Sequence, residues 1–160
     1  MNTKLEEAIR LRTGNQHKAA LRILDELLRA NPDDPEVNYQ MAWTCDSLGK
    51  ESEAVPFYER AIANGLSEGR SGAYLGLGST YRALGEYEKS LKVFDAAIRE
   101  FPHDRALKVF RSLTLYNLGK PSDSVGELLV QLLDTTSDDS IKKYENALRF
   151  YSDKLDETWK

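Results

Sequence analysis

Apolar residues recur along this chain at the spacing of an α-helix, and the pattern is clearest from Tyr74 to Pro102. Large and small apolar residues follow one another three or four positions apart, the pattern stops at Gly85, and it resumes until Pro102. Residues at this spacing lie on one face of a helix, whereas glycine and proline interrupt helices. The stretch therefore predicts a pair of helices that share one apolar seam.

The same pattern returns along the chain with a nearly constant period. The glycines that end an apolar helical pattern are Gly14, Gly49, Gly85 and Gly119, which subtraction places 35, 36 and 34 residues apart. A fixed period of about 34 residues with one helix pair per period indicates a helical repeat protein. The pattern predicts a single domain over residues 1–160, with four repeats at about 3–33, 34–66, 71–103 and 104–134.

A further helix is predicted after the repeats, at about residues 140–156. Its apolar residues alternate in steps of three and four, which places them on one helix face: Ile141, Tyr144, Leu148, Tyr151 and Leu155. Repeat arrays need a terminal element with a polar outer face, so we expect this helix to cap the last repeat. Burying these residues would contribute about 1.5–3 kcal/mol each, while ordering the segment costs about 1–2 kcal/mol per residue. Because these quantities nearly cancel, two questions stay undecided by the sequence. The helix could fill a binding groove instead of capping the last repeat, and the groove could be accessible to a foreign ligand in either case.

The third repeat carries the motif of one family of helical repeats. The motif positions are filled by Tyr74, Leu77-Gly78, Tyr81, Gly85-Glu86-Tyr87, Ser90, Phe94, Ala97 and Pro102. With these residues the chain resembles the tetratricopeptide repeat (TPR) family, and in particular its short stand-alone bacterial members. The resemblance extends to about Leu133 and is weakest in the fourth repeat, where Arg111-Ser112 stands in place of Leu-Gly.

This resemblance implies both a fold and a mode of action. The implied fold is an all-α, right-handed α-solenoid of about four TPR helix hairpins plus the C-terminal capping helix. In such a fold the first helices of the hairpins line a concave face on which other proteins bind. We therefore expect a non-enzymatic protein–protein interaction module that binds a protein or peptide and carries no cofactor. The alternative is a self-assembling structural protein that oligomerises through its groove or its terminal helix.

In this register the residues that face the groove can be named. The predicted partner-binding residues are largely apolar and aromatic: Tyr39, Trp43, Asp46, Leu75, Arg82, Phe110, Leu113 and Tyr116. The groove is rimmed by charged residues, which include Arg12 and Glu36. Such a groove suits an amphipathic helix. Members of the family that grip a C-terminal carboxylate use a combination of Lys, Asn and Arg that this chain lacks, so we expect no carboxylate clamp.

Composition and charge narrow the class of partner. The chain has 160 residues, a net charge of −4 and a pI of about 5.3. These values argue against nucleic acid as a partner, because phosphate binding needs clustered lysines and arginines. No apolar run approaches the ~18 residues of a membrane span, and the charged N-terminus lacks the apolar core of a signal peptide. We expect a cytoplasmic protein that does not bind a membrane.

The sequence shows no catalytic or metal-binding motif. His17 and His103 are the only histidines, and neither has a second His or Cys at ligand spacing. Gly76-Leu77-Gly78 lacks the strand and the third glycine of a phosphate-binding loop, so we interpret these glycines as helix-packing residues. Cys45, the only cysteine, falls on the apolar seam and is interpreted as a core residue.

Overall fold

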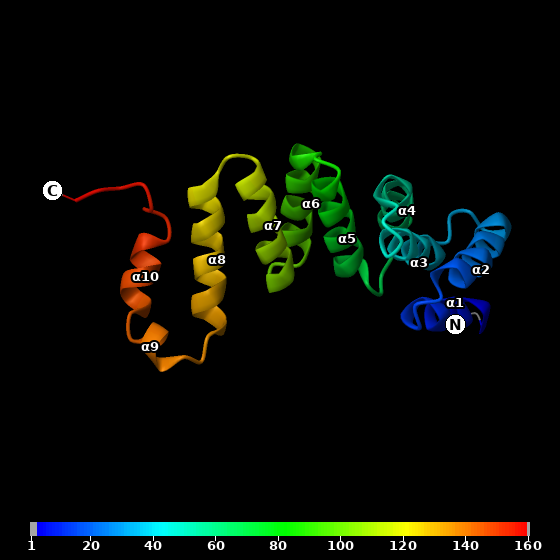
Figure 1. Cartoon of the computed structure of the whole chain (residues 1–160), viewed down its shortest axis with the longest axis horizontal. Helices are drawn as coiled ribbons and strands as arrows, with labels where there is room; N and C mark the ends of the chain where they lie inside the picture. The colour runs from blue at the N-terminus through cyan, green and yellow to red at the C-terminus, as the bar shows by residue number, and fades with distance from the viewer. Residues whose placement is uncertain (1–2, 160) are drawn as a thin grey trace. The chain divides into compact units, whose positions relative to one another are not determined.

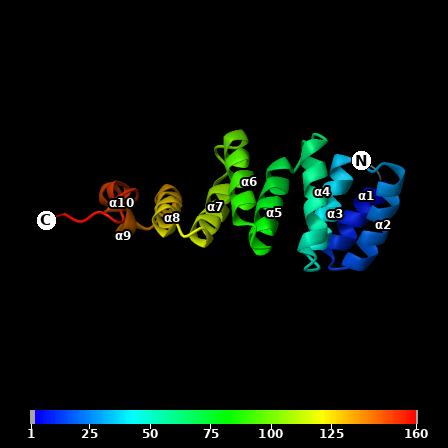
Figure 2. The ribbon, with the colours of Figure 1, turned by 90° about the horizontal axis from the view of Figure 1, so that it is seen from above.

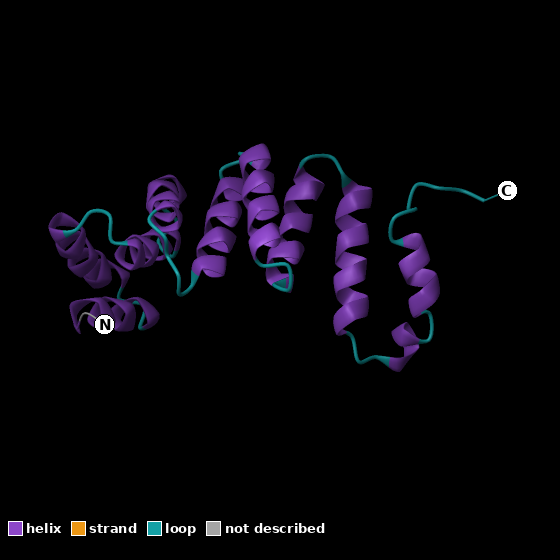
Figure 3. Ribbon diagram, turned by 180° about the vertical axis from the view of Figure 1, so that it is seen from behind, coloured by secondary structure: helices purple, strands orange, loops and turns teal. Residues whose placement is uncertain are grey.

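The computed structural model describes residues 3–159, which form ten α-helices joined by turns and include no strand (Figures 1 and 3). This confirms the all-α fold expected from the sequence. The chain divides into two compact units, Met1–Glu86 and Tyr87–Lys160, and the boundary lies between the two helices of the third predicted repeat. The repeat period shows no break at this point, because the period depends on the spacing of helices along the chain. It does not depend on which helices pack against one another.

The first unit contains two complete hairpins and the first helix of the third: α1 (Thr3–Thr13), α2 (His17–Ala30), α3 (Pro35–Asp46), α4 (Glu51–Ala63) and α5 (Arg70–Ala83). Each helix packs against the next one in the chain, and α3 also contacts α1 and α5. Figure 2 shows α3 and α4 side by side. Because α3 has neighbours on several faces, 8 of its 12 residues are buried, and it forms the centre of the unit.

The boundaries of these helices follow from their capping residues. The Asp34 carboxylate accepts hydrogen bonds from the backbone N–H groups of Glu36 and Val37 at 3.1 and 3.0 Å, so it satisfies donors that the first turn of α3 leaves unpaired. At the other end Gly49 adopts φ 68°, and the next N–H group returns to the carbonyl of Cys45 at 3.0 Å. Glycine adopts this left-handed conformation at low cost, which is why the repeat period could be read from glycines.

The second unit contains α6 (Tyr87–Glu100), α7 (Arg105–Asn117), α8 (Pro121–Thr135), α9 (Asp139–Lys142) and α10 (Glu145–Tyr151). Helix α7 packs against both α6 and α8, and α10 packs against α8 (Figure 1). The apolar core includes Phe94, Ala97, Leu107, Leu115 and Leu133. Polar groups inside it are paired, since the Ser90 and Thr114 hydroxyls lie 2.8 Å apart and form a buried hydrogen bond.

The departure of the fourth repeat from the TPR motif has a structural reason. Arg111 on α7 donates from Nε to Asp95 on α6 at 2.7 Å and from a terminal nitrogen to Glu127 on α8 at 2.9 Å. The adjacent Ser112 is fully buried; its hydroxyl lies 3.2 Å from Glu127, and its carbonyl accepts a hydrogen bond from Ser124. Arg-Ser in place of Leu-Gly therefore joins three helices through a polar network.

The C-terminal segment differs from the single helix predicted at about 140–156. It forms the two short helices α9 and α10, which are separated at Lys143-Tyr144, where Tyr144 has φ −109° and ψ 14°. The predicted apolar stripe is partly exposed, since Tyr144, Tyr151 and Leu155 are 57%, 44% and 41% exposed. Charge contributes to holding the segment on the unit: Arg149 in α10 reaches Asp134 in α8 at 2.7 Å. Among the described residues, no helix is long and apolar enough to cross a membrane.

Candidate functional site

The predicted partner-binding residues fall into one group in each unit. Tyr39, Trp43, Asp46, Leu75 and Arg82 lie on α3 and α5 of the first unit, whereas Phe110, Leu113 and Tyr116 lie on α7 of the second. All of them are on the first helix of a hairpin, where the sequence pattern placed them. The contacts of the two groups differ.

In the first unit, Trp43 forms a stack with an arginine from the preceding repeat. Trp43 is 42% exposed, and the guanidinium carbon of Arg12 lies 3.8 Å from the centre of its ring. The Tyr39 ring packs beside Trp43 with 5.7 Å between ring centres. Nε of Arg12 also donates to Oε1 of Gln40 at 3.3 Å. We call this arrangement the Arg12–Trp43 stack; it presents an aromatic face and a cation on one surface.

The sequence pattern placed Arg12 only at the rim of the predicted groove. The structure places it directly against Trp43, because α1 and α3 are in contact and the two residues stand nearly one repeat period apart. A comparison of equivalent positions in successive repeats could have found the pair. Burial lowers the pKa of Arg12 below its usual value, as expected for a charged group that is partly removed from water.

Asp46 is occupied by contacts within the unit. One carboxylate oxygen accepts a hydrogen bond from the Tyr58 hydroxyl at 2.8 Å, and both oxygens lie within 3.0 Å of the Thr80 hydroxyl. Burial raises the pKa of Asp46 above its usual value, and the two hydrogen bonds oppose this shift. Asp46 therefore joins α3 to α4 and α5.

Glycines on α5 let two tyrosines approach this helix closely. A Cβ atom added at Gly72 would lie 2.6 Å from the Tyr39 hydroxyl, and one added at Gly76 would lie 2.5 Å from both Cζ and the hydroxyl of Tyr58. Both distances are shorter than any normal contact of a Cβ atom, so a residue other than glycine at either position would require the tyrosine to move. The sequence analysis interpreted Gly76 as a helix-packing residue, and the structure shows that the Tyr58 ring of α4 covers it. Leu75 and Arg82, on the same helix, are half-buried.

In the second unit, an apolar row follows one face of α7. Phe110 is half-buried, Leu113 is 38% exposed and Tyr116 is 67% exposed. The three residues are spaced by three positions, which places them near one another along the helix surface. Large apolar side chains that remain exposed in a row are typical of interaction surfaces.

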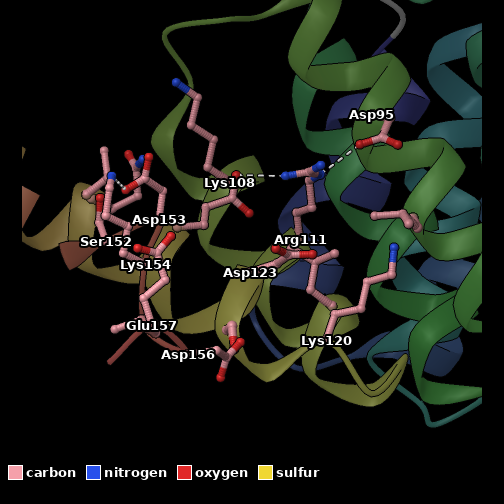
Figure 4. A pocket seen from close by; sticks show the side chains of 18 residues that line it. Asp95, Lys108, Arg111, Lys120, Asp123, Ser152, Asp153, Lys154, Asp156 and Glu157 are labelled. Atoms are coloured by element: carbon pink, nitrogen blue, oxygen red, sulfur yellow. Dashed lines mark hydrogen bonds and ion pairs between the residues drawn. The ribbon is translucent and has the colours of Figure 1, made fainter. Parts of the chain in front are cut away.

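The second unit also contains a polar pocket that the sequence pattern did not predict. The pocket has a volume of about 950 Å³ and lies between α6, α7, α8 and residues 152–157. Figure 4 shows Arg111 pointing toward Asp95, with Lys154 and Glu157 of the C-terminal segment on the other side. The segment is held where the backbone of Ser152 meets Gly126. No repeat motif includes this segment, so no sequence signal pointed to the pocket.

The histidine, cysteine and acidic side chains of residues 3–159 do not form a metal site, and the thiol of Cys45 is buried. Among the described residues, no three His, Cys, Asp or Glu side chains gather as a metal site. Cys45 is 2% exposed, and burial raises the pKa of its thiol to about 11, so little of the reactive thiolate form exists at neutral pH.

Comparison with known proteins identifies the family. A family model described as "Tetratrico peptide repeat" matches residues 35–155, about three quarters of the chain. The chain belongs to the tetratricopeptide repeat family. The match begins at α3, and the structure adds the α1–α2 hairpin that precedes it.

Solved TPR structures share this fold. A thermophilic TPR protein of Thermus thermophilus is 25% identical, with a TM-score of 0.66 over 96% of this chain and 84% of that chain. YrrB, described as a TPR protein with an unusual peptide-binding site, is 15% identical, with a TM-score of 0.72 over 94% of this chain and 77% of that chain. Among curated proteins, Superkiller protein 3 of Saccharomyces cerevisiae is 30% identical over 76 residues, which span 48% of this chain but only 5% of that protein.

Proposed function

We propose that this TPR protein is a non-enzymatic interaction module that binds a peptide or an amphipathic helix through the first helices of its hairpins. The observation that carries the proposal is the Arg12–Trp43 stack, in which a tryptophan of a well-packed unit remains 42% exposed. TPR proteins bind protein partners, and the structurally similar YrrB is described as having a peptide-binding site. The exposed row on α7 is the corresponding surface of the second unit.

The stack has the properties of a binding hot spot. Tryptophan and arginine are enriched among the residues that dominate binding energy. Because Arg12 and Tyr39 already contact the Trp43 ring, little side-chain entropy is lost when a ligand covers its exposed part. A ligand would also remove the remaining apolar surface of the ring from water, at about 25 cal/mol per Å².

A peptide-display experiment tests the proposal. Peptides would be selected from a random library on the immobilised wild-type protein, and their affinities for purified variants measured by fluorescence anisotropy. We expect Trp43→Ala to weaken binding by about 30-fold or more, the loss that a hot spot of about 2 kcal/mol gives. Trp159→Ala is the matched control, because it removes the other tryptophan, which is 59% exposed in the second unit. Equal binding by both variants would refute the proposal.

Self-assembly is the second candidate, and the C-terminal end of the chain favours it. Phe150, Tyr151 and Trp159 form an exposed aromatic cluster with ring centres 5.4, 5.5 and 5.9 Å apart. Light scattering after size-exclusion chromatography would test whether copies associate through this cluster. In that case Trp159→Ala, and not Trp43→Ala, should shift the protein toward the monomer. A wild-type protein that stays monomeric at high concentration would exclude this candidate.

A further inference from the structure

Arg12 differs from Arg111, another partly buried arginine, in having no anionic partner within residues 3–159. Arg111 pairs with Asp95 and Glu127. Arg12 is also half-buried, but within residues 3–159 its contacts are the Gln40 side chain and the Trp43 ring, and no carboxylate. A cation that is partly removed from water without an opposite charge is unfavourable, and it is stabilised when an anion arrives.

The contacts of Arg12 fix its position and leave binding groups available. Nε is used by Gln40 at 3.3 Å, and the guanidinium lies over the Trp43 ring at 3.8 Å. The terminal nitrogens make no hydrogen bond to any side chain or carbonyl of the described residues. Guanidinium N–H groups form a rigid fork that matches a carboxylate in two parallel hydrogen bonds. The amide –NH₂ of Gln40 is a further donor beside the fork.

Within the part of the chain that the structure describes, no carboxylate is bonded to Arg12. The Asp46 carboxylate, three residues after Trp43, already accepts the hydroxyls of Tyr58 and Thr80. Tyr39, which packs on Trp43, keeps a neutral hydroxyl at physiological pH, because burial raises its pKa above the usual value. The surface around the stack therefore offers hydrogen-bond donors, one positive charge and an aromatic face.

We propose that the peptide bound by the first unit carries an acidic side chain that pairs with Arg12, next to an apolar side chain that covers Trp43. The inference rests on the proposed function, since it names the chemistry of the ligand for the same surface. We assign the carboxylate to a glutamate or aspartate side chain because the exposed Trp43 ring borders Arg12, so that an acidic and an apolar residue on one face of a ligand helix would reach both.

Paired substitutions in protein and peptide test the proposal. The probes are two peptide libraries that differ only in a fixed Glu or a fixed Gln, placed about one helical turn from a fixed Leu so that both lie on one helix face. The proteins are the wild type, Arg12→Gln and the control Arg22→Gln, which removes the same charge from an exposed position of α2. Circular dichroism would verify that each variant is folded. Each selected peptide would be made both with an amidated and with a free C-terminus, so that binding through a terminal carboxylate is recognised.

We expect the wild type and Arg22→Gln to prefer the Glu peptides by at least about 10-fold, the usual worth of a hydrogen bond to a charged group. Arg12→Gln should lose this preference, and added salt should reduce it in the wild type. If selected peptides depend on Trp43 but bind equally well with Glu or Gln, or if Arg12→Gln keeps the preference, the inference is overturned while the proposed function stands. If only peptides with a free C-terminus bind, the assignment to a side chain is overturned. If no selected peptide depends on Trp43, both proposals fail.

Discussion

Replacing Gly76 by alanine tests whether the close approach of α4 and α5 limits the stability of the first unit. The added methyl group would lie 2.5 Å from Cζ and the hydroxyl of Tyr58, and 2.7 Å from Cε1. Tyr58 has little freedom to move, since it is 3% exposed and its hydroxyl donates to Asp46 at 2.8 Å. The substitution therefore overpacks a site that is already closed.

Two opposing effects set the expected magnitude. Overpacking a core costs about 1–3 kcal/mol, whereas alanine is favoured over glycine inside a helix by about 1 kcal/mol. Gly76→Ala should therefore lower the free energy of unfolding by about 1 kcal/mol in the wild type. Tyr58→Leu removes all three ring atoms that meet the new methyl group. In that background the same substitution should raise the free energy of unfolding by about 1 kcal/mol, which corresponds to a coupling of about 2 kcal/mol between the sites.

Chemical denaturation followed by far-ultraviolet circular dichroism would measure all four proteins of this cycle. The difference between Arg22→Ala and Arg22→Gly, at an exposed position within α2, gives the helix-propensity effect without a packing contribution. The decisive result is the sign of the Gly76→Ala effect in the two backgrounds. If alanine stabilises the wild type, or destabilises both backgrounds equally, the contact with Tyr58 does not limit packing and the reasoning is refuted.

Three further predictions concern the second unit and the cysteine. Gly126→Ala would force a methyl group against the Ser152 carbonyl oxygen, so residues 152–159 should be cleaved faster in limited proteolysis with unchanged helix content; an unchanged cleavage rate would contradict this. Hydrogen bonds from two arginines hold the pKa of Asp134 below its usual value. The stabilisation of α10 by Asp134 is therefore fully present above the unfolded pKa of about 3.9, and it is lost as the pH falls through the lower folded pKa. Hydrogen exchange in α10, corrected for the intrinsic rate, should become faster over this pH range in the wild type but not in Asp134→Asn. Burial raises the pKa of Cys45 to about 11, so alkylation at neutral pH should require unfolding, and rapid alkylation of the folded protein would disprove this.

Features that depend on local sequence were predictable. Asp34 and Asp104 precede α3 and α7 and cap them, as short polar residues before an apolar pattern commonly do. Gly49, Gly85 and Gly119 all adopt a positive φ, and their even spacing gave the repeat period. These signals involve a residue and its near neighbours along the chain, so they can be read without knowledge of the tertiary structure.

Features that depend on contacts between helices were not predictable in the same way. The sequence placed Gly76 correctly on α5 but could not show that a tyrosine of α4 fills the space above it. Arg12 was assigned to the rim because nothing in its own helix indicated the Trp43 ring, which belongs to another repeat. The C-terminal stripe satisfied helical spacing, yet the helix is interrupted at Tyr144, where spacing alone gives no information on backbone conformation. The predicted partner-binding residues of both units stay a prediction until a ligand is tested.

The Arg111 network bears on how this protein could be engineered. Repeat proteins are often stabilised by substituting residues of each repeat with the consensus residues of the family. Here the consensus pair Leu-Gly in place of Arg111-Ser112 would delete the cation that Asp95 and Glu127 share. Both carboxylates would lose their shared counter-charge, and the α7 backbone would lose a side chain that binds Glu127. The fourth repeat, which departs most from the TPR motif, is therefore the repeat for which the family consensus is the poorest guide to design.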